Sequence, residues 1–397
     1  MINAGKDFMK AMLSPQRSLY LKLEIYNSKM EYIKDITKQV SSDIGTLNIS
    51  GDSPIRRTFS LSLDNSLGEF VFGENNLIWI DKRIKLYLGL KTWNGNLEYI
   101  PMGVYVITEL EDNHTLDGKT ANINAVDKAY FMTDNRGKFI NEQIIATGTR
   151  ITDAIRTISS HVGETMFNFD DVTTTVPYEL TYGGEDNRWN ALQELAELAK
   201  CTIFYDVYGY LRLKKIDLNS FENEPVTWEY KYGDKKEKFY AGNVRKFNET
   251  NLANHIRVLG GKGDTATVIY DLTVDETDPV YGYLWKNHPY SIQKIGRVSY
   301  FHNNNSPDPL IVTQADALYR SKFELMNRLG FAEDVQLSIL ANYLHDVDDV
   351  IWLEDNENGI TGGKYLIKSI NLPLSPSLMS MEVVRYRKVI SDWNFIV

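Results

Sequence analysis

Residues 19–26 read LYLKLEIY, and their alternation of apolar and polar side chains decides the fold class. A period of two residues is typical of a β-strand with one buried face. The same alternation returns in TFSLSL at 58–63, in RIKLYL at 83–88 and along 99–108, with turn-forming residues between the runs. This spacing predicts an antiparallel β-barrel or sandwich domain over residues 18–135.

The rest of the chain divides into a short arm and two further domains. Residues 1–17 predict a polar N-terminal arm, which ends where Pro15 fixes the backbone. Over residues 136–224, two amphipathic helical patterns and a strand hairpin predict an α+β insert domain. The β pattern then returns and predicts a second β-barrel domain over residues 225–397.

The clearest helical pattern lies at 313–329, inside the second β domain. Thr313 and Asp316 resemble a capping pair at its start, and Gly330 is a natural helix stop. The preceding residues 273–312 are irregular, and a loop of this length needs support from partners or neighbouring domains. We therefore expect a mainly β protein with an α+β insert: two tube-like β-barrel or sandwich domains, the second carrying one amphipathic helix.

Composition limits the classes of function. The chain has 24 Tyr, 16 Phe and 7 Trp, an inventory that favours sheet. Its net charge of −10 argues against a general nucleic-acid binder, because such proteins need clustered Lys and Arg. The single cysteine, Cys201, cannot form an internal disulfide. Neither a signal peptide nor a transmembrane segment is indicated, so we expect no membrane insertion and residence in a cytoplasm unless a larger particle carries the protein out.

Residue types that carry metal or catalytic chemistry do not occur at the spacings that such chemistry requires. No metal-ligand spacing joins the six histidines, which are His114, His161, His255, His288, His302 and His345. An acidic loop could hold a hard cation, but its spacing is wrong for a calcium loop; it contains Asp346, Asp348, Asp349, Glu354, Asp355 and Glu357. We therefore predict no metal and no cofactor.

Catalytic patterns are likewise missing from the sequence. The run Gly260-Gly261-Lys262-Gly263 lacks the spacing of a phosphate-binding loop, and a hairpin turn explains it better. There is neither a Gly-x-Ser-x-Gly elbow nor a nucleophilic cysteine with a placed histidine. We predict no catalytic residues and expect that the protein is not an enzyme.

Aromatic clusters have two interpretations, core packing and exposed contact surface. For Phe70, Phe72 and Trp79, core packing is the simpler explanation. The irregular segment holds a second cluster, for which we favour a contact between subunits. The candidate interface residues are Tyr281, Tyr283, Trp285 and Tyr290.

Several stretches, taken in order, resemble phage tail hub proteins. In the first domain these are ISGDSPIRRTFSLSL at 49–63, NNLIWIDKRIKLY at 75–87 and IPMGVYVI at 100–107. The insert and the last domain contribute TVPY at 175–178, WNAL at 189–192, YDVYGYLR at 205–212, DDVI at 348–351 and GKYLI at 363–367. Similarity extends from about 18 to 390, and no single motif is diagnostic. The segment 273–312 has no counterpart in the family pattern.

The resemblance implies a baseplate hub found in phages, prophages and phage-tail-like particles. Three subunits, each with two tube-like domains, would form a homotrimeric ring that joins the tail tube or distal tail protein to the central spike or tail-tip protein. A tape-measure protein is a further possible partner, and DNA would only pass through the lumen. An acidic balance suits such passage. The alternative is a tail-tip protein whose exposed aromatic side chains bind cell-wall glycan on the host surface.

Overall fold

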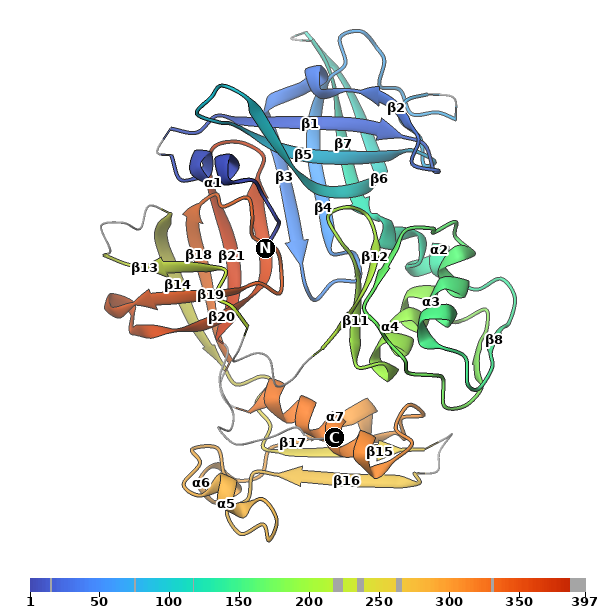
Figure 1. Cartoon of the computed structure of the whole chain (residues 1–397), viewed down its shortest axis with the longest axis vertical. Coiled ribbons are helices and arrows are strands. Elements are labelled where there is room, and N and C mark those ends of the chain that lie inside the picture. The colour runs from blue at the N-terminus through green and yellow to red at the C-terminus, as the bar shows by residue number, and fades with distance from the viewer. Residues whose placement is uncertain are drawn as a thin grey trace.

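The structure is a computed structural model that describes residues 1–385 except 15, 75, 117, 217–223, 234–238, 262–265 and 330–331. Four units are visible in Figure 1: a first β unit at the top, a second β unit on the left, an α+β insert on the right and a distal unit at the bottom. Strands outnumber helices, which confirms the mainly β class.

The first β unit follows the alternation seen in the sequence. Within LYLKLEIY, Leu23 and Ile25 are fully buried, and the whole run pairs antiparallel with a neighbouring strand from Leu19↔Leu90 to Tyr26↔Arg83. The strands of this unit are β1 (Leu19–Tyr26), β2 (Tyr32–Asp35), β3 (Val40–Ser50), β4 (Arg57–Asp64), β5 (Arg83–Lys91), β6 (Leu97–Thr115) and β7 (Gly118–Asp127).

The second β unit does not form a separate tube. Its strands are β13 (Trp228–Lys231), β14 (Tyr240–Asn248), β18 (Ala332–Leu340), β19 (Val350–Asp355), β20 (Ile360–Pro373) and β21 (Leu378–Arg385). The end of β20 pairs with β3 from Ser369↔Ser50 to Pro373↔Thr46. Both β units therefore share one sheet of 13 strands, whose main path is β14-β18-β21-β20-β3-β4-β7-β6-β5-β1-β2, and they share one hydrophobic core. We expected two tubes, but the described strands form one sheet without closing into separate barrels.

The insert has a core of its own. Helices α3 (Ile151–Ser160) and α4 (Arg188–Leu198) follow the two predicted amphipathic patterns, and Ile155, Ile158 and Leu192 are fully buried. The predicted hairpin is present as β11 (Cys201–Tyr205) and β12 (Leu211–Lys215), which pair antiparallel around Gly209 at φ 82°. The remaining elements are α2 (Asp134–Gly137), β8 (Gln143–Ile145), β9 (Phe167–Phe169) and β10 (Leu180–Tyr182).

The distal unit is the main difference from the expected architecture. We expected residues 253–329 inside the second β-barrel, but they form a separate sheet with its own core. Strands β15 (His255–Gly260) and β16 (Val268–Thr273) pack against helix α7 (Gln314–Arg328), and β17 (Ser299–Phe301) pairs with β15. Two short helices, α5 (Gly282–Trp285) and α6 (Ile292–Ile295), lie in the segment expected to be irregular.

Helix α7 (Gln314–Arg328) confirms the predicted helix and its start. Thr313 and Asp316 form a full capping box, in which each side chain accepts a hydrogen bond from the other residue's backbone N–H. The predicted stop at Gly330 and the turn at 262–263 lie outside the described residues. Residues 260 and 268 nevertheless pair, so β15 and β16 form the hairpin that the glycines indicated.

The N-terminal residues form a packed element. Helix α1 (Lys6–Met12) inserts Phe8 and Met12 into the shared core, and Ile2 is also buried. We expected a polar arm here, but three apolar side chains are enough to hold the segment against both β units. Within the described residues, none of the helices has the length and apolar character needed to cross a bilayer.

Candidate functional site

The outward face of the shared sheet carries a band of small, uncharged polar side chains. One row crosses five strands by direct pairing, Ser338–Ser380–Asn371–Asn48–Thr58. We call the whole set the polar band; it consists of Gln336 and Ser338 on β18, Ser380 on β21, Ser369 and Asn371 on β20, Thr46, Asn48 and Ser50 on β3, Thr58 and Ser60 on β4, and Asn122 and Asn124 on β7.

The polar band is ordered by contacts between its own members. Asn371 donates a hydrogen bond to the Asn48 side-chain oxygen at 2.5 Å, directly across the boundary between the two β units. Thr46 and Ser60 hydroxyls lie 3.2 Å apart on the neighbouring row. A groove of about 340 Å³ runs along the part of the band on β3, β20, β21 and β18 and reaches Lys246 on β14. The band thus continues across both β units without a break at their boundary.

Three charged side chains line this groove: the cation Lys246 and the carboxylates Asp334 and Glu382. Glu382 lies within the band, because it pairs directly with Gln336 and Ser369. A face of this kind offers hydrogen bonds but neither a cluster of cations to hold phosphates nor an apolar patch to hold another protein. Its chemistry suits weak, transient contact.

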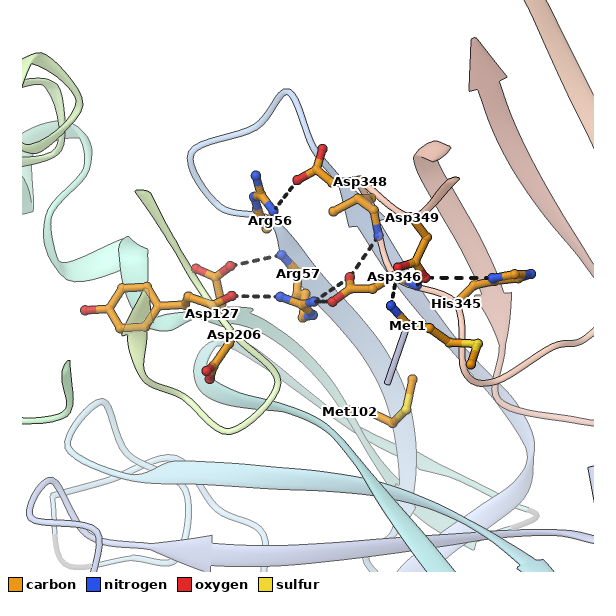
Figure 2. A network of polar contacts seen from close by, with 12 residues as sticks. Met1, Arg56, Arg57, Met102, Asp127, Asp206, His345, Asp346, Asp348 and Asp349 are labelled. Atoms are coloured by element: carbon orange, nitrogen blue, oxygen red, sulfur yellow. Dashed lines mark hydrogen bonds and ion pairs between the residues drawn. The ribbon is translucent and has the colours of Figure 1, made fainter. Parts of the chain in front are cut away.

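Behind the polar band, a chain of ion pairs joins three parts of the molecule (Figure 2). Arg57, at the start of β4, is almost fully buried, and its guanidinium donates to both oxygens of Asp346 in the second β unit at 2.6 and 2.5 Å. The same guanidinium donates to the Tyr205 carbonyl in the insert at 2.8 Å. One buried side chain therefore ties the first β unit to both of its neighbours.

Arg56 makes a parallel connection. Its guanidinium pairs with Asp348 at 3.0 Å and lies over the Phe204 ring of the insert, 4.0 Å from the ring centroid. Arg56 is itself buried, so the stacked cation is largely shielded from water. Both arginines come from the motif at 49–63 that carried the family resemblance.

Three carboxylates of the acidic loop form ion pairs with cationic groups of the same chain. Asp346 and Asp348 bind the two arginines, and Asp349 binds the α-amino group of Met1 and lies 3.8 Å from His345. These contacts account for three of the carboxylates that we weighed as calcium ligands, Asp346, Asp348 and Asp349. Among the residues that the structure describes, no group of three His, Cys, Asp or Glu side chains is placed to hold a metal ion.

Burial and charge shift the pKa values of this junction in opposite directions. Burial raises the pKa of Asp127 to about 6, against the hydrogen bonds that its carboxylate accepts from the Arg57 and Ala129 backbone N–H groups. Burial lowers the pKa of His345, and its interaction with Asp349 only partly compensates. Burial also opposes ionisation of Asp349, but contact with His345 and the terminal amine outweighs it and lowers the pKa.

The four candidate interface residues differ in how far they are buried. Tyr283 is 75% exposed, whereas Trp285 is completely buried in the core of the distal unit. Tyr281 and Tyr290 are partly buried against that core. Trp285 therefore cannot serve as a contact surface in this fold, and of the four only Tyr283 presents most of its ring to solvent.

The polar band was missed in the sequence although its signal was visible. At 58–62 the side chains that alternate with apolar residues are Thr, Ser and Ser, and at 46–50 they are Thr, Asn and Ser. Solvent-facing strand positions of this kind often carry charged residues. A run of small neutral residues on neighbouring strands is therefore the pattern that predicts such a face.

The fold resembles that of phage tail proteins of known structure. A tail protein from Neisseria meningitidis superposes with a TM-score of 0.61 at 11% identity, over 92% of this chain and 96% of that one. The 43 kDa tail protein of prophage MuSo2 from Shewanella oneidensis gives 0.55 at 13% identity, over 92% and 98%. A chain of the Francisella PdpA–VgrG complex gives 0.53 at 11% identity, over 96% of this chain and 54% of that one.

The similarity between this chain and these tail proteins is one of fold, because their sequences are only 11% and 13% identical to it. No protein family model matches the chain, and no curated protein matches its sequence. The match over nearly the full length of two tail proteins confirms the resemblance inferred from the sequence at the level of the fold.

Proposed function

We propose that the chain is a structural protein of a phage-type tail, where it forms the baseplate hub that joins the tail tube to the central spike or tail tip. Its fold, shared over almost the whole chain with phage tail proteins, supports the tail role. The observation that carries the hub role is the polar band, which spans both β units on one continuous sheet.

A ring of three copies would present this sheet six times around its axis, once from each β unit. The pairing of β20 with β3 sets the angle between the two units within a copy. The buried arginines behind it hold that angle against the insert as well. A homotrimer would therefore adapt a sixfold tube to a threefold spike, in line with the sequence resemblance.

The polar band is the proposed wall of the central channel. A wall that is mostly uncharged, in a protein of net charge −10, would let DNA pass without retaining it, because no cation cluster replaces the counterions of the phosphates. The same wall suits passage of a tape-measure protein. The role is structural, and we assign neither catalysis nor a cofactor to it.

Partners and location follow from this role. We propose contacts with a tail-tube or distal tail protein at one end of the ring and with a spike or tail-tip protein at the other, in the tail of a virion assembled in the host cytoplasm. The similarity to a chain of the PdpA–VgrG complex supports a place beside such proteins. Burial of Trp285 removes one of the aromatic side chains on which the alternative of glycan binding depended.

Light scattering and electron microscopy test the proposal. The chain is mixed with the tail proteins encoded by its neighbouring genes, and the mass and symmetry of the complex are measured. We expect a threefold ring with the polar band lining its channel. A chain that stays monomeric beside those proteins, or a ring that turns the polar band outward, would contradict the hub role.

A further inference from the structure

The distal unit is joined to the second β unit by a narrow base. On the side of the second β unit, Asn248 at the end of β14 pairs with Ala332 at the start of β18. On the side of the distal unit, the Ala253 N–H donates a hydrogen bond to the Arg328 carbonyl at 2.9 Å. The first crossing of the chain between these two pairs consists of residues 249–252, which form neither helix nor strand and of which the first three are exposed. Small changes of backbone angle in such a segment turn one unit against another, and we call residues 249–252 the hinge.

The distal unit shares neither a sheet nor a core with the rest of the molecule. Among the described strands, β15, β16 and β17 form a sheet of their own. In the part of the chain that the structure describes, the buried apolar side chains of the insert and those of the distal unit form two clusters with no member in common. Relative motion of two units is the normal expectation unless the surface between them is large and apolar.

An open cleft of about 220 Å³ lies between the insert and the distal unit. Helix α4 and strand β11 line it from the insert, and helix α7 lines it from the distal unit (Figure 1). On α7 the half-buried rings of Tyr319 and Phe323 border it. Well-packed protein interiors leave few voids larger than a water molecule, so the two units are packed loosely where they face each other.

Two contacts bridge this cleft. The Arg320 guanidinium on α7 lies 3.5 Å from the Glu197 carboxylate on α4. The Lys200 amine lies over the Tyr319 ring, 4.3 Å from its centroid. The Glu197 side chain is 48% exposed, and ion pairs and cation–π contacts at exposed sites are weak. We call these four residues the latch.

Like charges oppose the docking of the distal unit on the insert. Burial raises the pKa of Glu194 on α4, and so do the charges of Asp308, Asp186 and Glu197, against a hydrogen bond with Tyr182. Of these groups only Asp308 belongs to the distal unit. Docking therefore places a carboxylate of the distal unit near a carboxylate of the insert that already has two acidic neighbours, and this repulsion reduces what the latch contributes.

The insert, in contrast, is held firmly to the two β units. The buried Arg57 and Arg56 bind the insert and the second β unit at the same time. We propose that the distal unit turns as one body about the hinge, and that the latch holds it docked on the insert. The hinge and the latch lie within a single chain, so they do not depend on the proposed ring. The chain thus has one part that changes position while the long sheet and the insert keep theirs.

Distances between two spin labels on the full chain, measured by double electron–electron resonance, test the hinge. Cys201→Ala first removes the native thiol. One label pair, Thr157→Cys with Ile269→Cys, joins α3 of the insert to β16 of the distal unit. The other, Thr157→Cys with Tyr20→Cys, joins α3 to β1 of the first β unit, and all three labelled positions are exposed. We expect a broader distance distribution with a second, undocked population from the first pair, and a single narrow distribution from the second pair.

Substitutions in the latch test its role with the same two label pairs. Glu197→Gln should raise the undocked population about two- to fivefold, the factor expected for loss of an exposed ion pair, and adding Tyr319→Ala should raise it further. The matched control is Glu185→Gln, which removes an exposed ion pair of 3.6 Å with Lys138 within the insert and should leave both distributions unchanged. The second label pair should keep its distribution in every variant, which shows that the fold is intact. A first-pair distribution as narrow as the second in all variants would overturn the hinge, and a broad one that ignores both latch variants would overturn the latch.

Discussion

The Arg57 guanidinium binds Asp346 through both carboxylate oxygens, although 289 positions separate the two residues in the chain. Arg57 is 1% exposed, and the contact lies where the first β unit, the second β unit and the insert meet. Burial opposes the charged state of Arg57, but the charges of Asp346, Asp127 and Asp206 together with Tyr105 outweigh it and raise the arginine pKa. The guanidinium of Arg57 therefore stays charged although it is buried.

Removing the guanidinium should destabilise the protein strongly. Arg57→Met leaves Asp346 without its buried partner, and breaking a buried pair on one side costs about 3–5 kcal/mol of unfolding free energy. The double variant Arg57→Met with Asp346→Leu should recover most of this loss, because no unpaired charge remains. Urea unfolding measures both. Lys138→Met, which breaks an exposed pair with Glu185, is the control and should change the free energy by less than about 1 kcal/mol.

Asp127 should make stability depend on pH in an unusual direction. Its pKa rises from 3.8 to about 6 on folding, so the unfolded chain ionises first and the folded state loses stability as pH rises from 4 to 6. At 1.4 kcal/mol per pKa unit the loss approaches about 3 kcal/mol. The difference in unfolding free energy between wild type and Asp127→Asn, measured from pH 4 to 7, isolates this effect. A difference that stays constant over that range would refute it.

Trp285 and Tyr283 should respond differently to truncation. Trp285→Ala opens a cavity in the core of the distal unit and should cost about 3–5 kcal/mol. Tyr283→Ala removes an exposed ring and should change the unfolding free energy by less than about 0.5 kcal/mol. Thermal unfolding followed by near-ultraviolet circular dichroism distinguishes the two. Equal effects of both variants would contradict the core position of Trp285.

Placing cations on the polar band should make the protein retain DNA. Asn48→Lys with Asn371→Lys puts two charges beside each other at the boundary of the β units, and we expect DNA affinity to rise about tenfold at low salt and to fall steeply with added salt. Fluorescence anisotropy with duplex DNA provides the measurement. The control carries the same two charges on the exposed face of α3, as Thr157→Lys with Ser160→Lys. If the control binds DNA equally well, net charge alone explains the effect.

Local patterns in the sequence predicted elements better than their arrangement. The runs at 58–63 and 83–88 became β4 and β5, and the helical stripe at 313–329 became α7, because periodicity and capping act within a few residues. The assignment of 253–329 to the second barrel was wrong for a physical reason. A strand pattern shows which face is buried but not which sheet buries it, and β15 pairs with β16 on one side and with β17 on the other instead.

The candidate site was harder to predict because it is made by contacts between distant residues. Nothing near Arg57 in the sequence indicates that its partner is Asp346, and the acidic loop was weighed only as a cation site, which its spacing did not support. Trp285 was assigned to an interface because its neighbours are irregular, yet short helices and loops can bury a large ring as well as strands do. The fold-level resemblance survived these errors because it depended on the order of several stretches.

The pairing of β20 with β3 also has a consequence for synthesis. Asn371 meets Asn48 across 323 positions, so the ribosome must add all of these residues before β3 acquires this neighbour. Until then the nascent first unit keeps an unsatisfied strand edge, and contacts of such long sequence separation form slowly. Translation therefore delays the moment at which the long sheet is complete.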